Sequence, residues 1–182
     1  MSAVLLSPNS TPEASHSYNY EVVDGQIVEG PPMGAFETSV ASDLLILLRM
    51  ANLPGRAVNE MLFQLKADRK LKRRPDVAYV SHLRWPRERR VPRTEAWDVI
   101  PDLAIEVASQ SNAAEEILIK IREYFQAGCL RVWVVYPTED QIYVYESPTK
   151  VRILTRHDVL EDAAVLPGFR LNLADLFEDG TE

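Results

Sequence analysis

Residues 100–128 read IPDLAIEVASQSNAAEEILIKIREYFQAG, and this stretch decides the fold. It opens as a largely apolar, strand-like run that ends at Val107, with the charged Glu106 just inside that end. It then passes through a polar turn into an amphipathic helical pattern that carries Lys120 and Tyr124. A carboxylate inside an apolar strand is costly to bury without a partner or a cation. Glu106 is therefore the first candidate for a chemical role.

Strand and helix patterns continue on both sides of this stretch. Asp24-Gly25 separates two β-prone runs, which predicts a hairpin over residues 20–29. Apolar residues at helical spacing predict a helix over residues 36–51. Gly128 is well placed to end the helix that follows the central strand. Apolar runs predict further strands over residues 56–66, 75–80, 130–136, 141–146 and 151–155.

The length of 182 residues fits one domain with a sizeable core. We expect that domain over residues 18–182, after an irregular arm rich in Ser, Pro and Asn over residues 1–17. Cys129 is the single cysteine, which excludes an intrachain disulfide and a thiolate zinc cage. No early apolar run is long enough for a signal peptide or a membrane span, so we expect a cytoplasmic protein with no membrane partner.

Basic residues are concentrated in one part of an acidic chain. The net charge of −7 argues against a surface that coats nucleic acid indiscriminately. Eleven of the twenty Lys and Arg residues nevertheless lie between Lys66 and Arg93. Part of this region is a long irregular connection over residues 81–99, and long loops inside compact domains tend to be functional.

Two interpretations of this connection are open. Basic residues interleaved with Trp85 and Trp97 suit contact with phosphates and bases. The alternative is a solvated loop whose Trp side chains pack into the core. Under the first interpretation, the candidate nucleic-acid-binding residues are Arg74, Arg87, Arg89, Arg90 and Arg93.

Asp76 and Glu106 form a candidate acidic site. Asp76 begins one short strand pattern, and Glu106 lies late in the next. If the two strands are neighbours, one side-chain parity puts both carboxylates on the same face of the sheet. Converging carboxylates suit Mg²⁺ or Mn²⁺, which can lower the pKa of a bound water and polarise a phosphoryl oxygen. A nearby lysine can orient that water or neutralise charge that develops on the phosphate.

Several motifs, in their order along the chain, resemble one known family. KRRPDVAYVS, IPDLAIEVASQSN and EEILIKIREYFQAG are similar to motifs of the restriction-endonuclease family called Uma-two, within the PD-(D/E)XK nuclease-like superfamily. YEVVDGQIVEGPPMG, LRVWVVYP and PGFRLNLADLF agree with it too, so the resemblance extends over residues 18–177. It implies an α/β fold of restriction-endonuclease-like type, with a mixed, curved β-sheet flanked by helices.

The resemblance also implies roles for individual residues. Asp76 looks like the motif aspartate and Glu106 like the second metal-binding acid, with the backbone carbonyl of Val107 as a further candidate ligand. The motif lysine would normally stand two residues beyond the acid, where this chain has Ala108. Family members typically supply the lysine from the following helix, and Lys120 matches that position. Supporting positions on the same helix are Glu116 and Tyr124.

Two further positions depart from the family pattern. Glu37 stands where the family usually has a histidine at the start of its first helix, which keeps a candidate metal-facing group but changes its charge. Ser109-Gln110-Ser111 stands where the family has Ser-Pro-Ser, which removes a rigid residue from the turn that aims Lys120.

Glu37, Glu116 and Lys120 also have simpler explanations, and Asp102 is a further acid in the same region. Glu37 lies in the first turn of its helix, where an acid interacts favourably with the helix dipole. Glu116 and Lys120 are spaced i,i+4, which is also the spacing of an exposed ion pair. Asp102 forms a second Pro-Asp pair, but four residues of strand separate it by about 13 Å from Glu106. We interpret Asp102 as a strand-entry residue.

These observations lead to one functional hypothesis and two rivals. The hypothesis is hydrolysis of DNA phosphodiester bonds with Mg²⁺ or Mn²⁺ held by the acids, with Glu37 assisting and Lys120 acting on the water or the phosphate. The basic loop would grip the DNA backbone electrostatically. One rival is a catalytically weakened module of the same fold that binds nucleic acid or a protein partner without cleavage. The other is a metal-dependent hydrolase of a different phosphoester. The resemblance further implies a homodimer.

Overall fold

The computed structural model describes residues 19–30, 32–66, 70–109 and 113–177. The arm expected over residues 1–17 lies outside these ranges, as do Gln110 and Ser111 of the turn before the second long helix. The described elements are, in chain order, β1 (Tyr20–Val23), β2 (Gln26–Glu29), α1 (Ala35–Met50), β3 (Gly55–Asn59), β4 (Phe63–Gln64), β5 (Lys72–Arg73), β6 (Val77–Ser81), β7 (Leu103–Val107), α2 (Ala114–Ala127), β8 (Arg131–Tyr136), η1 (Pro137–Glu139), β9 (Gln141–Ser147), β10 (Lys150–Thr155), β11 (Val159–Glu161), β12 (Arg170–Asn172) and α3 (Leu173–Leu176).

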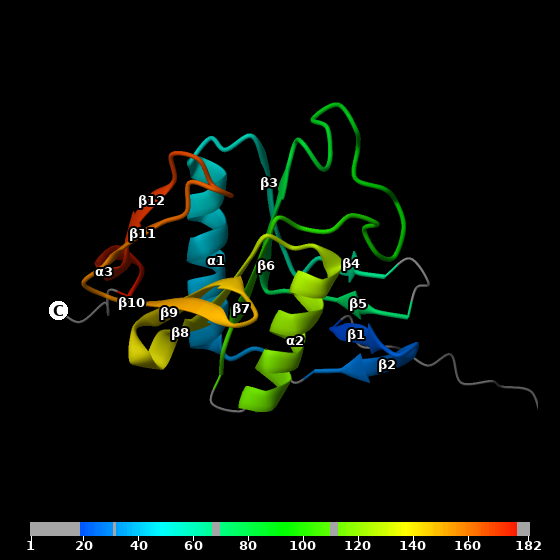
Figure 1. Ribbon diagram of the computed structural model, residues 1–182, viewed down its shortest axis with the longest axis horizontal. Helices are drawn as coiled ribbons and strands as arrows, with labels where there is room; N and C mark the ends of the chain where they lie inside the picture. Colours follow the sequence, from blue (N-terminus) through cyan, green and yellow to red (C-terminus); the bar gives the residue numbers. More distant parts are fainter. Residues whose placement is uncertain (1–18, 31, 67–69, 110–112, 178–182) are drawn as a thin grey trace, which may run out of the picture.

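A six-stranded sheet forms the centre of the molecule, in the order β10-β9-β8-β7-β6-β3 (Figure 1). β7 and β8 are parallel, and the other neighbouring pairs are antiparallel. A parallel pair needs a crossover connection, and α2 supplies it between β7 and β8. Gly128 ends α2 with a φ of 101°, as expected of a helix C-cap. The predicted α/β fold with a mixed sheet is confirmed.

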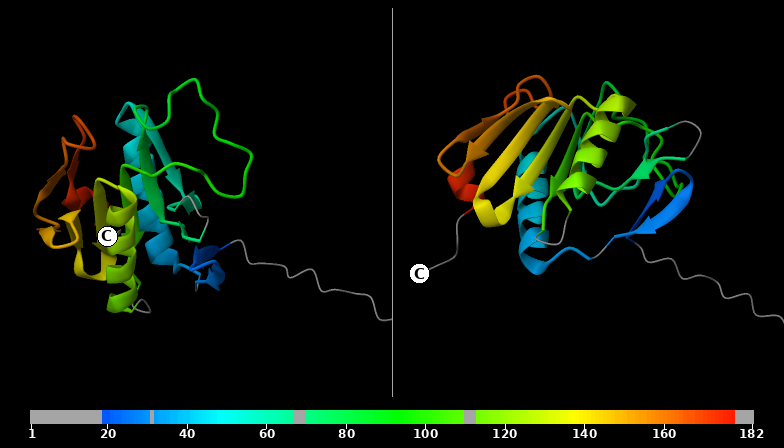
Figure 2. Two further views of the ribbon diagram at one scale, coloured as in Figure 1. Left: turned by 45° about the vertical axis from the view of Figure 1, so that its right-hand side comes forward. Right: turned by 60° about the horizontal axis from the view of Figure 1, so that its bottom comes forward.

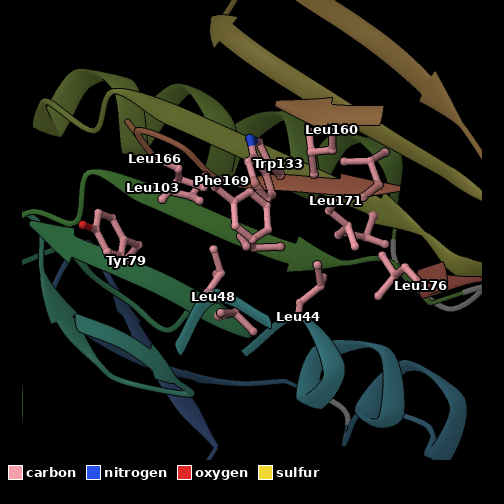
Figure 3. Packing of buried hydrophobic residues seen from close by; sticks show 14 of the residues in the cluster. Leu44, Leu48, Tyr79, Leu103, Trp133, Leu160, Leu166, Phe169, Leu171 and Leu176 are labelled. Atoms are coloured by element: carbon pink, nitrogen blue, oxygen red, sulfur yellow. The ribbon is translucent and has the colours of Figure 1, made fainter. Parts of the chain in front are cut away.

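The two long helices cover opposite faces of this sheet (Figure 2). The odd-numbered residues of β7 lie in the core under α1, together with Leu44 and Trp133 (Figure 3). Ala104, between them in β7, lies instead in the core under α2, with Ile121 and Tyr124. This alternation is the two-residue period of a strand. Even-numbered positions of β7 therefore face α2.

A small four-stranded sheet, in the order β2-β1-β5-β4, lies on the α2 side (Figure 1). Its hairpin forms where it was predicted, because β1 and β2 pair across Asp24 and Gly25. These two turn residues have φ values of 52° and 81°, as a two-residue hairpin turn of the primed type requires. Arg73 of β5 donates a hydrogen bond of 2.6 Å to Glu123, which joins the small sheet to α2.

The prediction of one strand over residues 56–66 is wrong. The chain forms β3 and β4 instead, and the two belong to different sheets. Glu60 lies between them with a φ of 45°, in the left-handed region that interrupts an extended run. The turn at Glu60 takes the chain from the central sheet to the small one.

The C-terminal segment completes the core under α1. β11 and β12 pair antiparallel, and Phe169, Leu171 and Leu176 pack in the same cluster as Leu44 (Figure 3). Within the described ranges, no helix is both long enough and apolar enough to cross a membrane.

Candidate active site

A cavity of about 340 Å³ opens where the central sheet, the small sheet and α2 meet. Its wall includes the residues at one end of β6 and β7 and those of the first half of α2. Among the described residues, more carboxylates than cations line it, which favours a bound cation over an anion. The acids are Glu21, Glu29, Glu60, Asp76, Glu106 and Glu116, and the cations are Arg74 and Lys120.

Asp76 and Glu106 lie across from each other on neighbouring strands. β6 and β7 are antiparallel with Val77 opposite Ile105, and continuing this register by one residue places Asp76 opposite Glu106. Opposite residues of an antiparallel pair project from the same face, here the face covered by α2. The N–H of Val107 also donates a hydrogen bond of 2.6 Å to Asp76 Oδ2. The structure thus brings the two predicted acids together.

The backbone of Val107 lies at the same point. Its side chain packs in the core under α1, while the residue also lines the cavity. In an extended strand the N–H and the C=O of one residue point to the same side. The carbonyl, a predicted ligand, therefore faces the side on which the N–H of Val107 meets Asp76.

Glu106 is held by two residues of α2. Its side chain is buried, the Tyr124 hydroxyl donates a hydrogen bond of 2.7 Å to Oε1, and Lys120 Nζ lies 3.0 Å from Oε2. Burial raises the pKa of Glu106 above its ordinary value, while Lys120 acts in the opposite sense. Burial also raises the pKa of Tyr124 well above its ordinary value, so this hydroxyl stays protonated and continues to donate.

Asp76 has an electrostatic environment that suits a cation site. Burial and the charge of Glu106 raise the pKa of Asp76 to about 7, against the hydrogen bond from Val107 and the attraction of Lys120. Carboxylates this close cannot both ionise easily unless a positive charge compensates them. Two carboxylates and one carbonyl form a hard-oxygen donor set, which fits Mg²⁺ or Mn²⁺ with water or substrate as the remaining ligands.

Lys120 projects toward the acids and is not the exposed partner of Glu116. Its Nζ lies 3.0 Å from Glu106 Oε2 and 3.3 Å from Glu21 Oε1, and its side chain is 15% exposed. Although burial opposes the ammonium charge, Glu106 and Glu21 raise the pKa of Lys120 above its ordinary value. The alternative of a solvated i,i+4 pair is therefore wrong, and Glu116 lines the cavity separately.

Glu21, Arg73 and Glu60 belong to the site and were missed by the sequence reasoning. Glu21 of β1 accepts hydrogen bonds from Arg73 Nη1 at 2.6 Å and from the N–H of Arg74 at 2.9 Å. Glu60 lies on the other side of Asp76, whose carbonyl accepts a hydrogen bond of 3.1 Å from the Glu60 N–H. The one signal for Glu21 was a charge inside a β-prone run, the same signal that identified Glu106.

The structure does not bring Glu37 to this site, which corrects the prediction of a metal-facing role. Glu37 lies in the first turn of α1, its carboxylate folds back over Gly34, and it is not among the residues that line the cavity. This position agrees with the alternative of an interaction with the helix dipole. In the described part of the chain, no three His, Cys, Asp or Glu residues are grouped so as to hold a metal ion.

Most of the predicted nucleic-acid-binding residues lie away from the acids. The connection 82–102 joins the ends of β6 and β7 that are opposite to those carrying Asp76 and Glu106 (Figure 1). Arg74 lines the cavity. The arginines of the connection are exposed but are not among the cavity's lining residues; they are Arg87, Arg89, Arg90 and Arg93.

The two Trp side chains of this connection belong to the core, as in the second interpretation. Trp85 is 4% exposed and Trp97 is 1% exposed, and their rings meet edge to face at 5.2 Å. Trp97 also stacks on Phe63 at 5.8 Å, and the Arg89 guanidinium lies 3.7 Å from the centre of the Trp85 ring. Both rings are engaged inside the protein, so the interpretation that they stack on bases is wrong.

Asp102 is a strand-entry residue, as interpreted. Its carboxylate accepts a hydrogen bond of 2.6 Å from the N–H of Ser81 and lies 2.8 Å from Arg84 Nε. These contacts fix the start of β7 against the end of β6.

The chain is similar in sequence and in fold to known proteins. A family model described as Uma2, putative restriction endonuclease, matches residues 9–174. Among solved structures, the chain is similar to the crystal structure of a putative nuclease belonging to DUF820 from Anabaena variabilis. The TM-score is 0.75 at 18% sequence identity, over 87% of this chain and 89% of the other, and this likeness establishes the fold. No curated protein matches the sequence.

Proposed function

The chain belongs to the Uma2 family of putative restriction endonucleases, and from this premise we propose that it is a metal-dependent endonuclease that hydrolyses DNA phosphodiester bonds. The observation that carries the proposal is the position of Asp76 opposite Glu106, with Lys120 reaching Glu106 from α2. The cavity thus combines acids that suit a divalent cation with an amine that suits a phosphate.

In this proposal, Asp76, Glu106 and the carbonyl of Val107 hold Mg²⁺ or Mn²⁺. Bound there, the metal would polarise a phosphoryl oxygen and lower the pKa of a bound water. Glu60 adds negative charge beside Asp76, which favours a cation at this point. The Tyr124 hydroxyl holds one oxygen of Glu106 in place and so limits how far the carboxylate can rotate.

Lys120 and Arg74 supply positive charge on the same cavity wall. Lys120 would orient the attacking water or neutralise charge that develops on the phosphate in the transition state. Arg74 is held in place by hydrogen bonds from its guanidinium to the carbonyls of Tyr20 and Glu60. From there it would contact the DNA backbone next to the scissile bond.

Plasmid nicking in Mg²⁺ or Mn²⁺ tests this proposal. Wild type is compared with Asp76→Ala and Glu106→Ala, and with Glu37→Ala as the control acid outside the cavity. We expect both cavity variants to lose activity by roughly 100-fold or more, because a group that acts at the reacting centre is gone, and Glu37→Ala to retain it. Equal activity in all four proteins would eliminate the assignment.

One observation favours a second candidate function, binding of nucleic acid without cleavage. Lys120 is paired with two carboxylates, which offset its charge toward a phosphate. Under this alternative the purified protein retards duplex DNA in a gel but leaves it intact with either metal. Competition by duplex DNA against a small phosphodiester separates a DNA enzyme from a hydrolase of another phosphoester. The expected homodimer is a separate prediction, measured by light scattering coupled to size-exclusion chromatography.

A further inference from the structure

We infer that Glu21 is a positioning residue, which keeps Lys120 inside the cavity while Glu106 is engaged by a cation. The inference rests on the proposed function, in which Lys120 acts on the attacking water or on the phosphate. If Glu106 were the only partner of Lys120, metal binding by Glu106 would free Lys120 from the cavity. Glu21 comes from β1 of the small sheet, so the N-terminal hairpin becomes part of the site (Figure 1).

Glu21 is held in place by contacts other than the one with Lys120. One oxygen accepts a hydrogen bond of 2.6 Å from Arg73 Nη1, and the other accepts one of 2.9 Å from the N–H of Arg74. Arg73 is itself buried and also donates a hydrogen bond of 2.6 Å to Glu123 of α2. The Glu21 side chain is 13% exposed, so little water competes with these contacts. A carboxylate held in this way is a rigid anchor.

Lys120 lies between this anchor and Glu106. The distances from its Nζ are 3.3 Å to Glu21 and 3.0 Å to Glu106. A lysine side chain is long and flexible, so a single partner leaves its ammonium group several positions. A second carboxylate on another element reduces this freedom. The ammonium group therefore stays beside the acids even when one partner changes.

The second partner matters because Glu106 has two competing tasks. In the proposed function Glu106 would bind a divalent cation, and its oxygens would then be less available to Lys120, whose charge has the same sign as that of the cation. With Glu106 as its sole partner, Lys120 would leave for solvent when the metal binds. Glu21 lines the same cavity and holds Lys120 at the wall. The amine and the metal can then act on one phosphate together.

A purely structural role for Glu21 makes a different prediction, and Glu123 provides the matched control. Both acids bind Arg73 at 2.6 Å, and Glu123 is 18% exposed. Glu123 is not among the residues that line the cavity. Glu21→Gln and Glu123→Gln therefore each remove one charged partner of Arg73, and only Glu21→Gln removes a partner of Lys120.

The experiment has two readouts in wild type, Glu21→Gln and Glu123→Gln. The first is ¹⁵N NMR of the lysine ammonium groups, with the Lys120 signal assigned from Lys120→Arg. We expect a slowly exchanging, motionally restricted Lys120 signal in wild type and Glu123→Gln, and its loss or mobility in Glu21→Gln. The second is cleavage with Mg²⁺. We expect Glu21→Gln to lower kcat by roughly 10- to 100-fold with little change in KM, and Glu123→Gln to leave both unchanged.

The outcomes separate this inference from the proposed function. An unchanged Lys120 signal in Glu21→Gln, or an equal loss of kcat in Glu123→Gln, overturns the positioning role. A mobile Lys120 in Glu21→Gln, with no cleavage by wild type, supports the positioning of Lys120 and overturns the nuclease proposal. If Glu21→Gln fails to fold, Glu21→Asp serves in its place. That variant keeps the charge, draws the carboxylate back by one methylene, and should loosen Lys120 with a smaller loss of kcat.

Discussion

Asp76 and Asp102 each follow a proline at the entry of a neighbouring strand, yet their surroundings differ. Asp102 faces Arg84 and the N–H of Ser81, so its charge is compensated. Asp76 faces Glu106, and burial together with that charge raises its pKa to about 7. A partly buried carboxylate lowers the stability of the fold when desolvation and the repulsion of a neighbouring acid outweigh the attraction of a nearby cation, here Lys120. The same residue type thus has opposite energetic effects at the two positions.

Asparagine substitutions at these positions should change stability in opposite directions. Without added metal at neutral pH, we expect Asp76→Asn to raise the free energy of unfolding by on the order of 1 to 3 kcal/mol, because the repelled charge is removed. Asp102→Asn should lower it by about 1 to 3 kcal/mol, because a partner of Arg84 is lost. Urea denaturation measures both. A loss of stability in both variants would show that Asp76 is an ordinary structural residue.

The stabilisation of Asp76→Asn should also depend on pH. The pKa of Asp76 in the folded protein, about 7, is raised above the ordinary value, so the folded state binds more protons than the unfolded state between these values. Wild type therefore loses stability relative to the variant as pH rises from about 4 to about 7. Above pH 7 the difference should be constant. Thermal melts across this range check the sign, and a difference that shrinks as pH rises contradicts it.

Among the elements, those whose sequences carry periodic signals were predictable. The hairpin turn, α1, α2 with its Gly128 cap, and the strand β7 all follow from local patterns. The break at Glu60 did not follow from a local pattern, because a non-glycine residue with left-handed backbone conformation has no simple sequence signature. The sheet that a two-residue strand such as β4 joins was not predictable either, because contacts with residues distant in sequence decide it.

The candidate site was also predictable only in part from the sequence. Asp76 and Glu106 follow from strand parity once β6 and β7 are neighbours. Lys120 and Tyr124 followed from the family resemblance, because helix spacing alone also allowed an exposed ion pair between Glu116 and Lys120. The role of Glu21 was not predictable, because its contact with Lys120 joins residues far apart in sequence through a second sheet. No rule based on residue spacing predicts such a contact.

The connection between β6 and β7 should contribute to stability through its Trp residues. Trp97 is 1% exposed and packs against Phe63 and Trp85. We expect Trp97→Ala to cost about 3 to 5 kcal/mol of unfolding free energy. Leu83 lies on the same connection but is 97% exposed, so Leu83→Ala should stay within about 0.5 kcal/mol of wild type. Equal effects in chemical denaturation would mean that the connection is not packed as described.

In the whole molecule, the acidic cavity and the exposed arginines lie at opposite ends of β6 and β7. The five residues of β6 span about 16 Å. A duplex bound at the cavity would have to extend along the strands to reach the arginines. The two regions can therefore be tested separately, because the proposed cleavage would depend on the first and the proposed salt-dependent DNA binding on the second.

The salt dependence of DNA binding tests the second region. If the loop contacts phosphates, replacing Arg87, Arg90 and Arg93 by Ala should reduce the slope of log affinity against log salt by about 2 to 3. The control replaces Lys150 and Arg152, which are exposed on β10 at the edge of the central sheet away from β6, and Arg170, which is exposed on β12 of the separate two-stranded sheet. Arg89 is left in place because it packs on Trp85. Equal slopes for both triple variants would remove the loop from the DNA-binding surface.

Binding of Mn²⁺, followed by electron paramagnetic resonance in wild type, Glu106→Gln and Glu37→Gln, tests the central claim most directly. Glutamine keeps the size of each side chain and removes its charge, so the comparison isolates the carboxylate. Because Glu106 lies opposite Asp76 in the cavity and Glu37 lies outside it, we predict that binding is lost in Glu106→Gln and unchanged in Glu37→Gln. Equal affinity in all three proteins, or loss in Glu37→Gln alone, would contradict a metal centre at the ends of β6 and β7.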